Sequence, residues 1–173
     1  LILAAIQGVS EFIPVSSSAH LVLVSSLYQF KANSLLIDVS LHLGSLLAII
    51  YFFKKDLLNL KKNQNLLVLI TFGSIPIIIF GYILYITEII YLLREIKIIA
   101  WTTLIFGIIL YIADKNELNK KMSTDLNFKS ILLIGLFQML SLIPGVSRAG
   151  ITITAGRILG FNRTDSTKIS FYL

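Results

Sequence analysis

Residues 7–20 have the sequence Gln7-Gly8-Val9-Ser10-Glu11-Phe12-Ile13-Pro14-Val15-Ser16-Ser17-Ser18-Ala19-His20, which places acidic, hydroxyl and imidazole groups within an otherwise apolar segment. A second polar stretch, Pro144-Gly145-Val146-Ser147-Arg148-Ala149-Gly150, lies far downstream in similar surroundings. A charge at the centre of a membrane helix costs about 2.5–3.5 kcal/mol on insertion scales. If these segments lie in lipid, Glu11 and Arg148 are there for chemistry or transport rather than for folding.

The composition is typical of an integral membrane protein. Of the 173 residues, 56% are hydrophobic and 14% are charged, and the mean hydropathy is +0.87. The net charge of +6 would suggest a nucleic-acid partner in a soluble protein, but here the basic residues fall mainly in loops between apolar runs. We therefore expect a lipid bilayer, and not nucleic acid, as the partner. The oligomeric state stays open, a homo-oligomer included.

Three apolar runs between residues 38 and 113 are candidate transmembrane helices. Residues 66–87 contain no charge, and 22 residues of helix span about 33 Å, enough for a hydrocarbon core of about 30 Å. The runs 39–53 and 98–113 are long enough once their flanking residues are included. Pro76 lies within residues 66–87, and we expect it to kink that helix rather than to end it.

The charges of the connecting loops predict the orientation. Residues 54–65 carry four lysines against Asp56, residues 88–97 are balanced, and residues 114–129 again carry four lysines. By the positive-inside rule, the first and third of these loops face the cytoplasm and the second faces outward.

The two polar stretches predict helical hairpins that enter the membrane, break, and leave on the same side. Pro14 and the serines after it interrupt residues 1–30, and Pro144 with Gly145 interrupts residues 130–160. With the orientation above, the first hairpin opens outward and the second toward the cytoplasm. Their broken tips would then meet near the membrane midplane.

A weak internal repeat agrees with this arrangement. Ile13-Pro14 matches Ile143-Pro144 at an offset of 130 residues, and Ser17 matches Ser147 at the same offset. Repeats of opposite orientation often build a central site from discontinuous helices. We therefore predict an all-α, polytopic membrane bundle in which two re-entrant hairpins belong to inverted-topology repeats.

We expect residues 1–173 to form a single integral membrane domain of a longer protein. The chain begins with Leu rather than Met, and residues 167–173 resemble the start of a further apolar helix. The N-terminal stretch has neither a basic segment nor a small-residue cleavage site, so we do not expect a signal peptide.

Broken helices can form a phosphate site. The break leaves unpaired backbone N–H groups at a positive helix end, and both attract anions. If the helices after Ser18 and Gly150 begin at one place, that place can cradle a phosphate. Gly145 and Gly150 allow close approach of the backbone, and Arg148 supplies a planar cation suited to phosphate.

Side chains in the same stretches could carry a reaction. His20 is near enough in sequence to activate a serine as a nucleophile. Glu11 could hold a metal ion, orient His20 or accept a proton. The hydroxyl groups that could bind phosphate or attack it belong to Ser16, Ser17, Ser18 and Ser147.

Both stretches resemble the paired signature of the undecaprenyl pyrophosphate phosphatase family, also called bacitracin-resistance proteins. The order and spacing of Gln-Gly-x-[Ser/Thr]-Glu-Phe-[Leu/Ile]-Pro-[Val/Ile]-Ser-Ser-[Ser/Thr]-x-His and Pro-Gly-x-Ser-Arg-x-Gly-x-Thr are matched. The segment Asp38-Val39-Ser40-Leu41-His42-Leu43-Gly44-Ser45-Leu46-Leu47-Ala48 also resembles the family. The resemblance covers essentially the whole chain.

This resemblance implies a multi-pass enzyme of the bacterial inner membrane. Its reaction would convert undecaprenyl diphosphate to the monophosphate and inorganic phosphate, which recycles the lipid carrier of peptidoglycan synthesis and confers bacitracin resistance. It also implies a divalent cation, Mg²⁺ or Ca²⁺, with Glu11 as the expected ligand. The functional residues it implies in this chain are Glu11, Ser16, Ser17, His20, Ser147, Arg148 and Thr152.

Two residues depart from the family pattern. Some members have a second glutamate where this chain has Gln7, which cannot carry a negative charge and puts a two-carboxylate metal site in doubt. Many members have serine at the position of Ala149, so this chain has one hydroxyl fewer with which to bind phosphate.

Two chemical routes stay open. In the first, Ser17 attacks the terminal phosphorus with help from His20, while Arg148 and the hairpin-tip amides stabilise the charge on the phosphate oxygens. In the second, a water molecule activated by His20 or Glu11 attacks directly.

Other interpretations compete with an enzyme site. A transporter or flippase for a lipid phosphate would use the same midplane anion site. Glu11 and Arg148 could also form a structural ion pair between the hairpins. His42 lies in an apolar run, which predicts a helix contact. Arg157 and Arg163 are expected to anchor at the headgroup surface, and either could instead contact the substrate phosphate.

Overall fold

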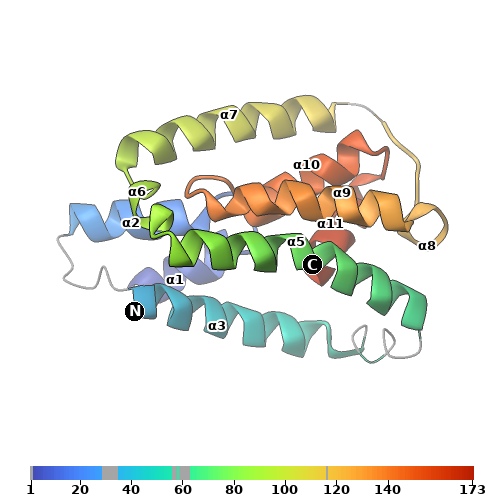
Figure 1. Ribbon diagram of the computed structural model, residues 1–173, viewed down its shortest axis with the longest axis horizontal. Helices are drawn as coiled ribbons and strands as arrows, with labels where there is room; N and C mark the ends of the chain where they lie inside the picture. The colour runs from blue at the N-terminus through green and yellow to red at the C-terminus, as the bar shows by residue number, and fades with distance from the viewer. Residues whose placement is uncertain (1, 29–34, 56–57, 59–62, 116) are drawn as a thin grey trace.

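The computed structural model describes residues 2–28, 35–55, 58, 63–115 and 117–173, and within these ranges every regular element is a helix (Figure 1). The all-α prediction is therefore confirmed. The helices are α1 Ile2–Ser10, α2 Ser17–Leu27, α3 Leu35–Phe52, α5 Gln64–Ile86, α6 Ile89–Leu92, α7 Ile96–Asp114, α8 Met122–Asp125, α9 Phe128–Met139, the 3-10 turn η1 Leu140–Leu142, α10 Arg148–Ile158 and α11 Arg163–Tyr172.

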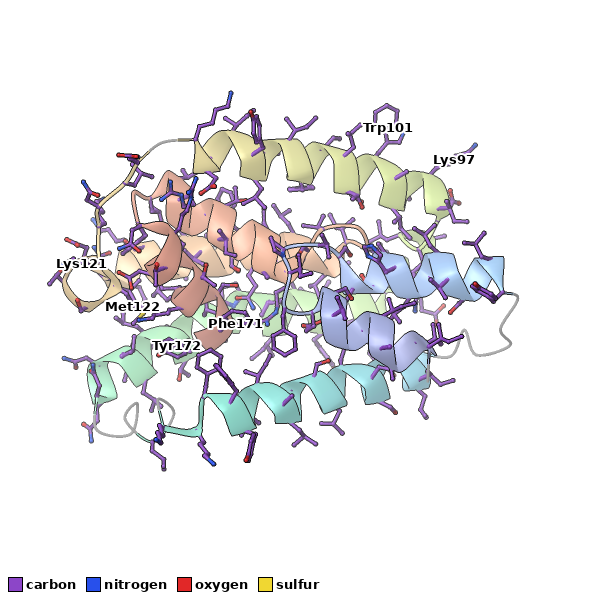
Figure 2. All side chains as sticks on the ribbon, turned by 180° about the vertical axis from the view of Figure 1, so that it is seen from behind. Lys97, Trp101, Lys121, Met122, Phe171 and Tyr172 are labelled. Atoms are coloured by element: carbon purple, nitrogen blue, oxygen red, sulfur yellow. The ribbon has the colours of Figure 1, made fainter. Side chains whose placement is uncertain are left out.

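Helices α5 and α7 are long and apolar enough to cross a membrane, and only 6% of the apolar window of each is buried. Their apolar side chains face outward, as Trp101 of α7 does in Figure 2, which lipid tolerates and water does not. The chain is thus a membrane protein, as its composition predicts. Pro76 lies inside α5 without ending it, also as expected. A shorter apolar helix covers Val39–Phe52 of α3.

Two pairs of helices meet end to end in the middle of the bundle. Helices α1 and α2 pack together and are joined by residues 11–16, and α9 packs against α10 through η1 and residues 143–147. The first pair opens toward the end of the bundle where α7 begins, and the second toward the end where α7 ends (Figure 1). The turns of the two pairs are in contact: the Gly145 N–H of one donates a hydrogen bond to Ser16 Oγ of the other at 3.2 Å.

Helix α9 crosses α5 at very close range. A Cβ atom on Gly135 would collide with the backbone carbonyl of Gly73, so only glycine fits at this crossing. The same face of α9 buries the centre of the core against α10 and α11. The buried apolar cluster comprises Ile131, Ile134, Ala155, Phe161 and Ile169.

The expectation that Arg157 anchors at the headgroup surface is wrong. This side chain is 3% exposed, its Nε lies 3.0 Å from Asp114 Oδ1, and its Nη1 donates to the carbonyl of Phe161 at 2.9 Å. A charge this buried is tolerated only when it is paired and hydrogen-bonded. Arg163 is exposed and donates from Nε to the same Asp114 oxygen at 2.9 Å, so both arginines tie the end of α7 to α10 and α11.

The last helix begins earlier than expected. We predicted a helix start at residues 167–173, but α11 begins at Arg163. Asn162 caps it, since its side chain accepts a hydrogen bond from the Asp165 N–H at 2.8 Å.

Candidate functional site

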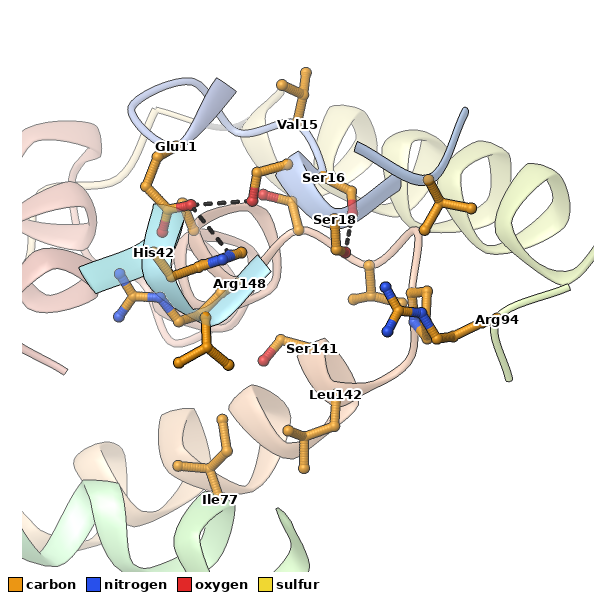
Figure 3. A pocket seen from close by; sticks show the side chains of 17 residues that line it. Glu11, Val15, Ser16, Ser18, His42, Ile77, Arg94, Ser141, Leu142 and Arg148 are labelled. Atoms are coloured by element: carbon orange, nitrogen blue, oxygen red, sulfur yellow. Dashed lines mark hydrogen bonds and ion pairs between the residues drawn. The ribbon is translucent and has the colours of Figure 1, made fainter. Parts of the chain in front are cut away.

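A cavity of about 410 Å³ lies where the two turns meet. It is lined by the start of α2, the start of α10, the middle of α3 and the segment before α7 (Figure 3). Its polar lining consists of Glu11, Ser16, Ser17, Ser18, His42, Arg94, Ser141, Ser147 and Arg148. The cavity thus brings the two polar stretches of the sequence to one place.

Glu11 is the centre of the hydrogen-bond network. Its Oε2 accepts from Gln7 Nε2 at 2.8 Å and from Ser17 Oγ at 3.0 Å, and His42 Nε2 lies 3.9 Å away. Gln7 can reach Glu11 because residues four apart share one face of a helical turn, and the Glu11 N–H still bonds the Gln7 carbonyl. Ser17 is the first residue of α2, so the turn between the helices folds its hydroxyl back onto the carboxylate.

A hydroxyl held by a carboxylate at hydrogen-bond distance is the geometry of a nucleophile beside its base. Arg148 lines the same cavity and begins α10, whose first turn is held by a cap: Ser147 Oγ accepts from the Gly150 N–H at 3.1 Å. Both α2 and α10 therefore start at the cavity, and their positive ends favour an anion there. The site can hold a phosphate between a nucleophile and a guanidinium.

Ser16 joins the two helix pairs. It is 4% exposed, and its Oγ accepts from the Ala19 N–H at 3.3 Å and from the Gly145 N–H at 3.2 Å. It also lies 3.1 Å from Ser18 Oγ. Ser16 lines the cavity, but it is buried and its oxygen holds the two turns together, whereas Ser18 and Ser147 are less buried in the same lining.

Three residues expected to bind phosphate lie behind the cavity wall. Gly145 has φ +95°, and a Cβ atom there would collide with Thr102 Oγ1. Gly150 donates its N–H to the Ser147 cap. Thr152 is buried, and its Oγ1 donates to Ser170 Oγ at 2.7 Å. In the structure these residues shape and support the site rather than line it.

His20 points away from the cavity, whereas His42 lines it. His20 is exposed, and its Nδ1 lies 2.7 Å from the Ser16 carbonyl oxygen. The contact with the Ser16 carbonyl, one turn earlier, holds the His20 ring against the backbone. The sequence predicts that His42, on α3, is a helix contact, but the structure places it in the cavity lining. The resemblance of residues 38–48 to the family is the signal that could have identified His42 as a site residue.

An apolar groove of about 360 Å³ adjoins the cavity. It shares Glu11, Val39, His42 and Arg148 with the cavity and continues along one face of α3. The apolar residues of this groove are Val39, Leu43, Leu46 and Ile49. A ligand with a charged head and a hydrocarbon tail fits this change from polar to apolar lining.

The residues around Glu11 fit an oxygen-preferring cation only in part. Among the described residues, no three His, Cys, Asp or Glu side chains are grouped so that they could hold a metal ion. Gln7 Oε1, however, is buried beside the Glu11 network without a hydrogen-bond partner among those residues. One carboxylate and one amide oxygen suit Mg²⁺ or Ca²⁺ when water and substrate phosphates supply the other ligands.

Comparison with known proteins assigns the family. The model of the family described as bacitracin resistance protein BacA matches residues 1–173. An undecaprenyl-diphosphatase from Pelagibacter ubique (strain HTCC1062) is 63% identical over 174 residues, covering 100% of this chain and 68% of the relative. A protein of the same name from Ruegeria sp. (strain TM1040) is 41% identical, covering 100% of this chain and 70% of the relative. Another, from Saccharophagus degradans (strain 2-40 / ATCC 43961 / DSM 17024), is 40% identical, covering 99% of this chain and 69% of the relative. The chain therefore belongs to the bacitracin resistance protein BacA family.

Proposed function

We propose that this protein is a membrane hydrolase that removes the terminal phosphate of undecaprenyl diphosphate, recycling the lipid carrier of cell-wall synthesis. The observation that carries the proposal is the hydrogen bond of 3.0 Å between Ser17 Oγ and Glu11 Oε2 in a cavity that Arg148 also lines. Membership of the family, whose relatives bear the name undecaprenyl-diphosphatase, supports the same reaction.

The first step is transfer of the terminal phosphoryl group to the protein. Ser17 Oγ attacks the terminal phosphorus as its proton passes to Glu11, and the bond from phosphorus to the bridging oxygen breaks. Undecaprenyl monophosphate leaves with that oxygen. Arg148 and the N–H groups at the start of α10 stabilise the charge that develops on the transferring group.

The second step is hydrolysis of the phosphoserine. A water molecule attacks the phosphorus, the bond from phosphorus to Ser17 Oγ breaks, and Glu11, now protonated, returns its proton to Oγ. The water's proton passes to an oxygen of the phosphate that is released. The products are inorganic phosphate and the free hydroxyl of Ser17. Direct attack by a water that occupies the place of the Ser17 hydroxyl is the competing route.

We assign to His42 the supporting role that the sequence suggested for His20. His42 Nε2 lies 3.9 Å from Glu11 Oε2, the oxygen that also accepts from Gln7, and can exchange a proton with the carboxylate or hold it in position. His20 bonds backbone instead. We expect the chemistry to depend on His42 and to tolerate changes of His20.

A divalent cation, Mg²⁺ or Ca²⁺, would be held by Glu11 together with Gln7 Oε1 and would neutralise charge on the diphosphate. Because Gln7 contributes a neutral oxygen, binding by the free protein would be weak, and substrate phosphates would complete the coordination.

We also propose that the two helix pairs are re-entrant hairpins of opposite orientation in the bacterial inner membrane. The pairs open toward opposite ends of α7, each second helix starts at a serine whose hydroxyl accepts an N–H three residues later, and the turns are hydrogen-bonded to each other. The apolar groove on α3 would then admit the polyprenyl chain from the lipid.

The test is phosphate release by the purified protein in detergent with undecaprenyl diphosphate as substrate. Steady release of inorganic phosphate is expected. A flippase for a lipid phosphate would also use the cavity, but it would release no phosphate in detergent. Absence of phosphate release would therefore contradict hydrolysis and favour transport.

A further inference from the structure

We propose that Arg94 is a second phosphate-binding residue, which holds the phosphate that stays on the lipid while Arg148 holds the phosphate that leaves. The assignment rests on the proposed hydrolysis of a diphosphate. The sequence of residues 88–97 indicates only a loop of balanced charge, and the structure places its arginine in the lining of the cavity.

Arg94 and Arg148 lie on opposite sides of one cavity. Figure 3 shows Arg94 on one side of the cavity with its guanidinium pointing inward, and Arg148 on the other side with its guanidinium beside His42 and Glu11. Among the described residues that line this cavity, these two are the only arginines, and none is a lysine. The cavity therefore offers one planar cation at each side, which matches a ligand with two adjacent anionic groups.

The position of Arg94 is fixed by α7 rather than by a free loop. Arg94 lies two residues before the first residue of α7, and Thr102 on that helix donates to the Pro144 carbonyl at 2.7 Å. Thr103 donates to the Gly145 carbonyl at 3.3 Å, on the next residue of the same turn. These bonds fix the start of α7 relative to the turn that carries Arg148. The distance between the two arginines is thus set by the fold.

The geometry decides which phosphate each arginine takes. The reacting phosphorus must lie next to Ser17, which is hydrogen-bonded to Glu11. Glu11 and Arg148 both line the adjoining apolar groove, and Arg94 does not. Arg94 is left with the phosphate on the other side of the bridging oxygen. As that bond breaks, negative charge grows on this second phosphate, so Arg94 both binds it and stabilises the leaving group.

The test compares Arg94→Gln and Arg94→Lys with Lys97→Gln, an exposed change on the same segment whose side chain points away from the bundle (Figure 2). We expect Arg94→Gln to lower kcat/KM for undecaprenyl diphosphate by about 10-fold to 100-fold, the loss of a charged hydrogen-bond pair. Inhibition by undecaprenyl monophosphate should weaken by a similar factor. Inhibition by inorganic phosphate, which occupies the Arg148 side, should change less than about twofold, and Arg94→Lys should recover part of the loss.

Two results would overturn the assignment: Arg94→Gln with the kinetics of Lys97→Gln, or equal weakening of inhibition by inorganic phosphate and by the monophosphate. If Arg94→Gln does not fold, Arg94→Lys is measured in the same assays. We then expect a smaller loss, with inhibition by the monophosphate again weakened more than inhibition by inorganic phosphate. The same two results would overturn the assignment. Wild-type protein that releases no phosphate would instead refute the proposed hydrolysis. Active wild-type protein with indifferent Arg94 variants refutes only the role of Arg94.

Discussion

At the scale of single residues, the carboxylate of Glu11 organises the site. It accepts hydrogen bonds from Gln7 and Ser17 and lies near His42, so three elements of the chain depend on its charge. A carboxylate that is half-enclosed and shared in this way is suited to take the proton of a hydroxyl during attack.

We predict that Ser17→Ala lowers kcat for phosphate release by at least about 10³-fold, because the attacking oxygen is lost. Glu11→Gln should cause a loss of about 10²-fold or more, since the amide cannot accept the proton. Rates are measured with purified protein at saturating undecaprenyl diphosphate. A rate for Ser17→Ala within tenfold of the wild type would exclude the serine route in favour of water.

We predict a different outcome for the two histidines. His42→Ala should lower kcat by about 10-fold to 100-fold, because its imidazole lies beside Glu11, whereas His20→Ala should change kcat less than about threefold. The same phosphate-release assay measures both. Loss of activity in His20→Ala with a normal His42→Ala would show that the imidazole of α2 turns into the cavity when substrate binds.

Sequence alone located the polar stretches but not every residue of the site. Glu11, Ser17 and Arg148 stood out because a charged or nucleophilic group inside apolar sequence is costly in lipid. His42 and Arg94 lie on other segments, and their approach to Glu11 and to the hairpin turns depends on tertiary packing, which no local pattern encodes. Arg157 was misinterpreted for the same reason, since its partner Asp114 is 43 residues away.

At the scale of helices, the contact between α5 and α9 depends on two glycines. A Cβ atom on Gly135 would collide with the Gly73 backbone, which cannot move aside as a flexible side chain can. Small residues at such crossings let membrane helices approach closely, and packing then holds them together.

We therefore predict that Gly135→Ala destabilises the protein by about 1–3 kcal/mol, the usual cost of overpacking. The matched control is Gly107→Ala on α7, where an added Cβ would meet no atom within 4 Å. Thermal unfolding in detergent, followed by circular dichroism, should give a lower Tm for Gly135→Ala and an unchanged or higher Tm for Gly107→Ala. Equal Tm values would show that α5 and α9 are not in this contact.

The long helices were predictable and the short breaks only partly so. Residues 66–87 and 98–113 were found within two residues of the ends of α5 and α7, because apolar length is a strong signal. The turn positions followed from Pro14 and Pro144. What each turn contacts did not follow, because the bond from Gly145 to Ser16 joins residues 129 apart in sequence.

At the scale of the whole molecule, the helix pairs and the loop charges together predict a defined orientation. The protein contains no cysteine, so single cysteines can be introduced without a background. A cysteine at Lys97, near the start of α7, should react with an impermeant maleimide added to intact cells. A cysteine at Lys121, after the end of α7, should react only after permeabilisation. Labelling of both positions from the same side would contradict a membrane-spanning α7.

The central claim is that the cavity between the two hairpin turns is where the diphosphate is hydrolysed. The most direct measurement is the rate of phosphate release from undecaprenyl diphosphate by Arg148→Gln, compared with Arg163→Gln, whose side chain is exposed and pairs with Asp114 at the far end of α7. We predict a loss of about 10²-fold to 10³-fold for Arg148→Gln and a rate within about twofold of the wild type for Arg163→Gln. A wild-type rate for Arg148→Gln would contradict the account.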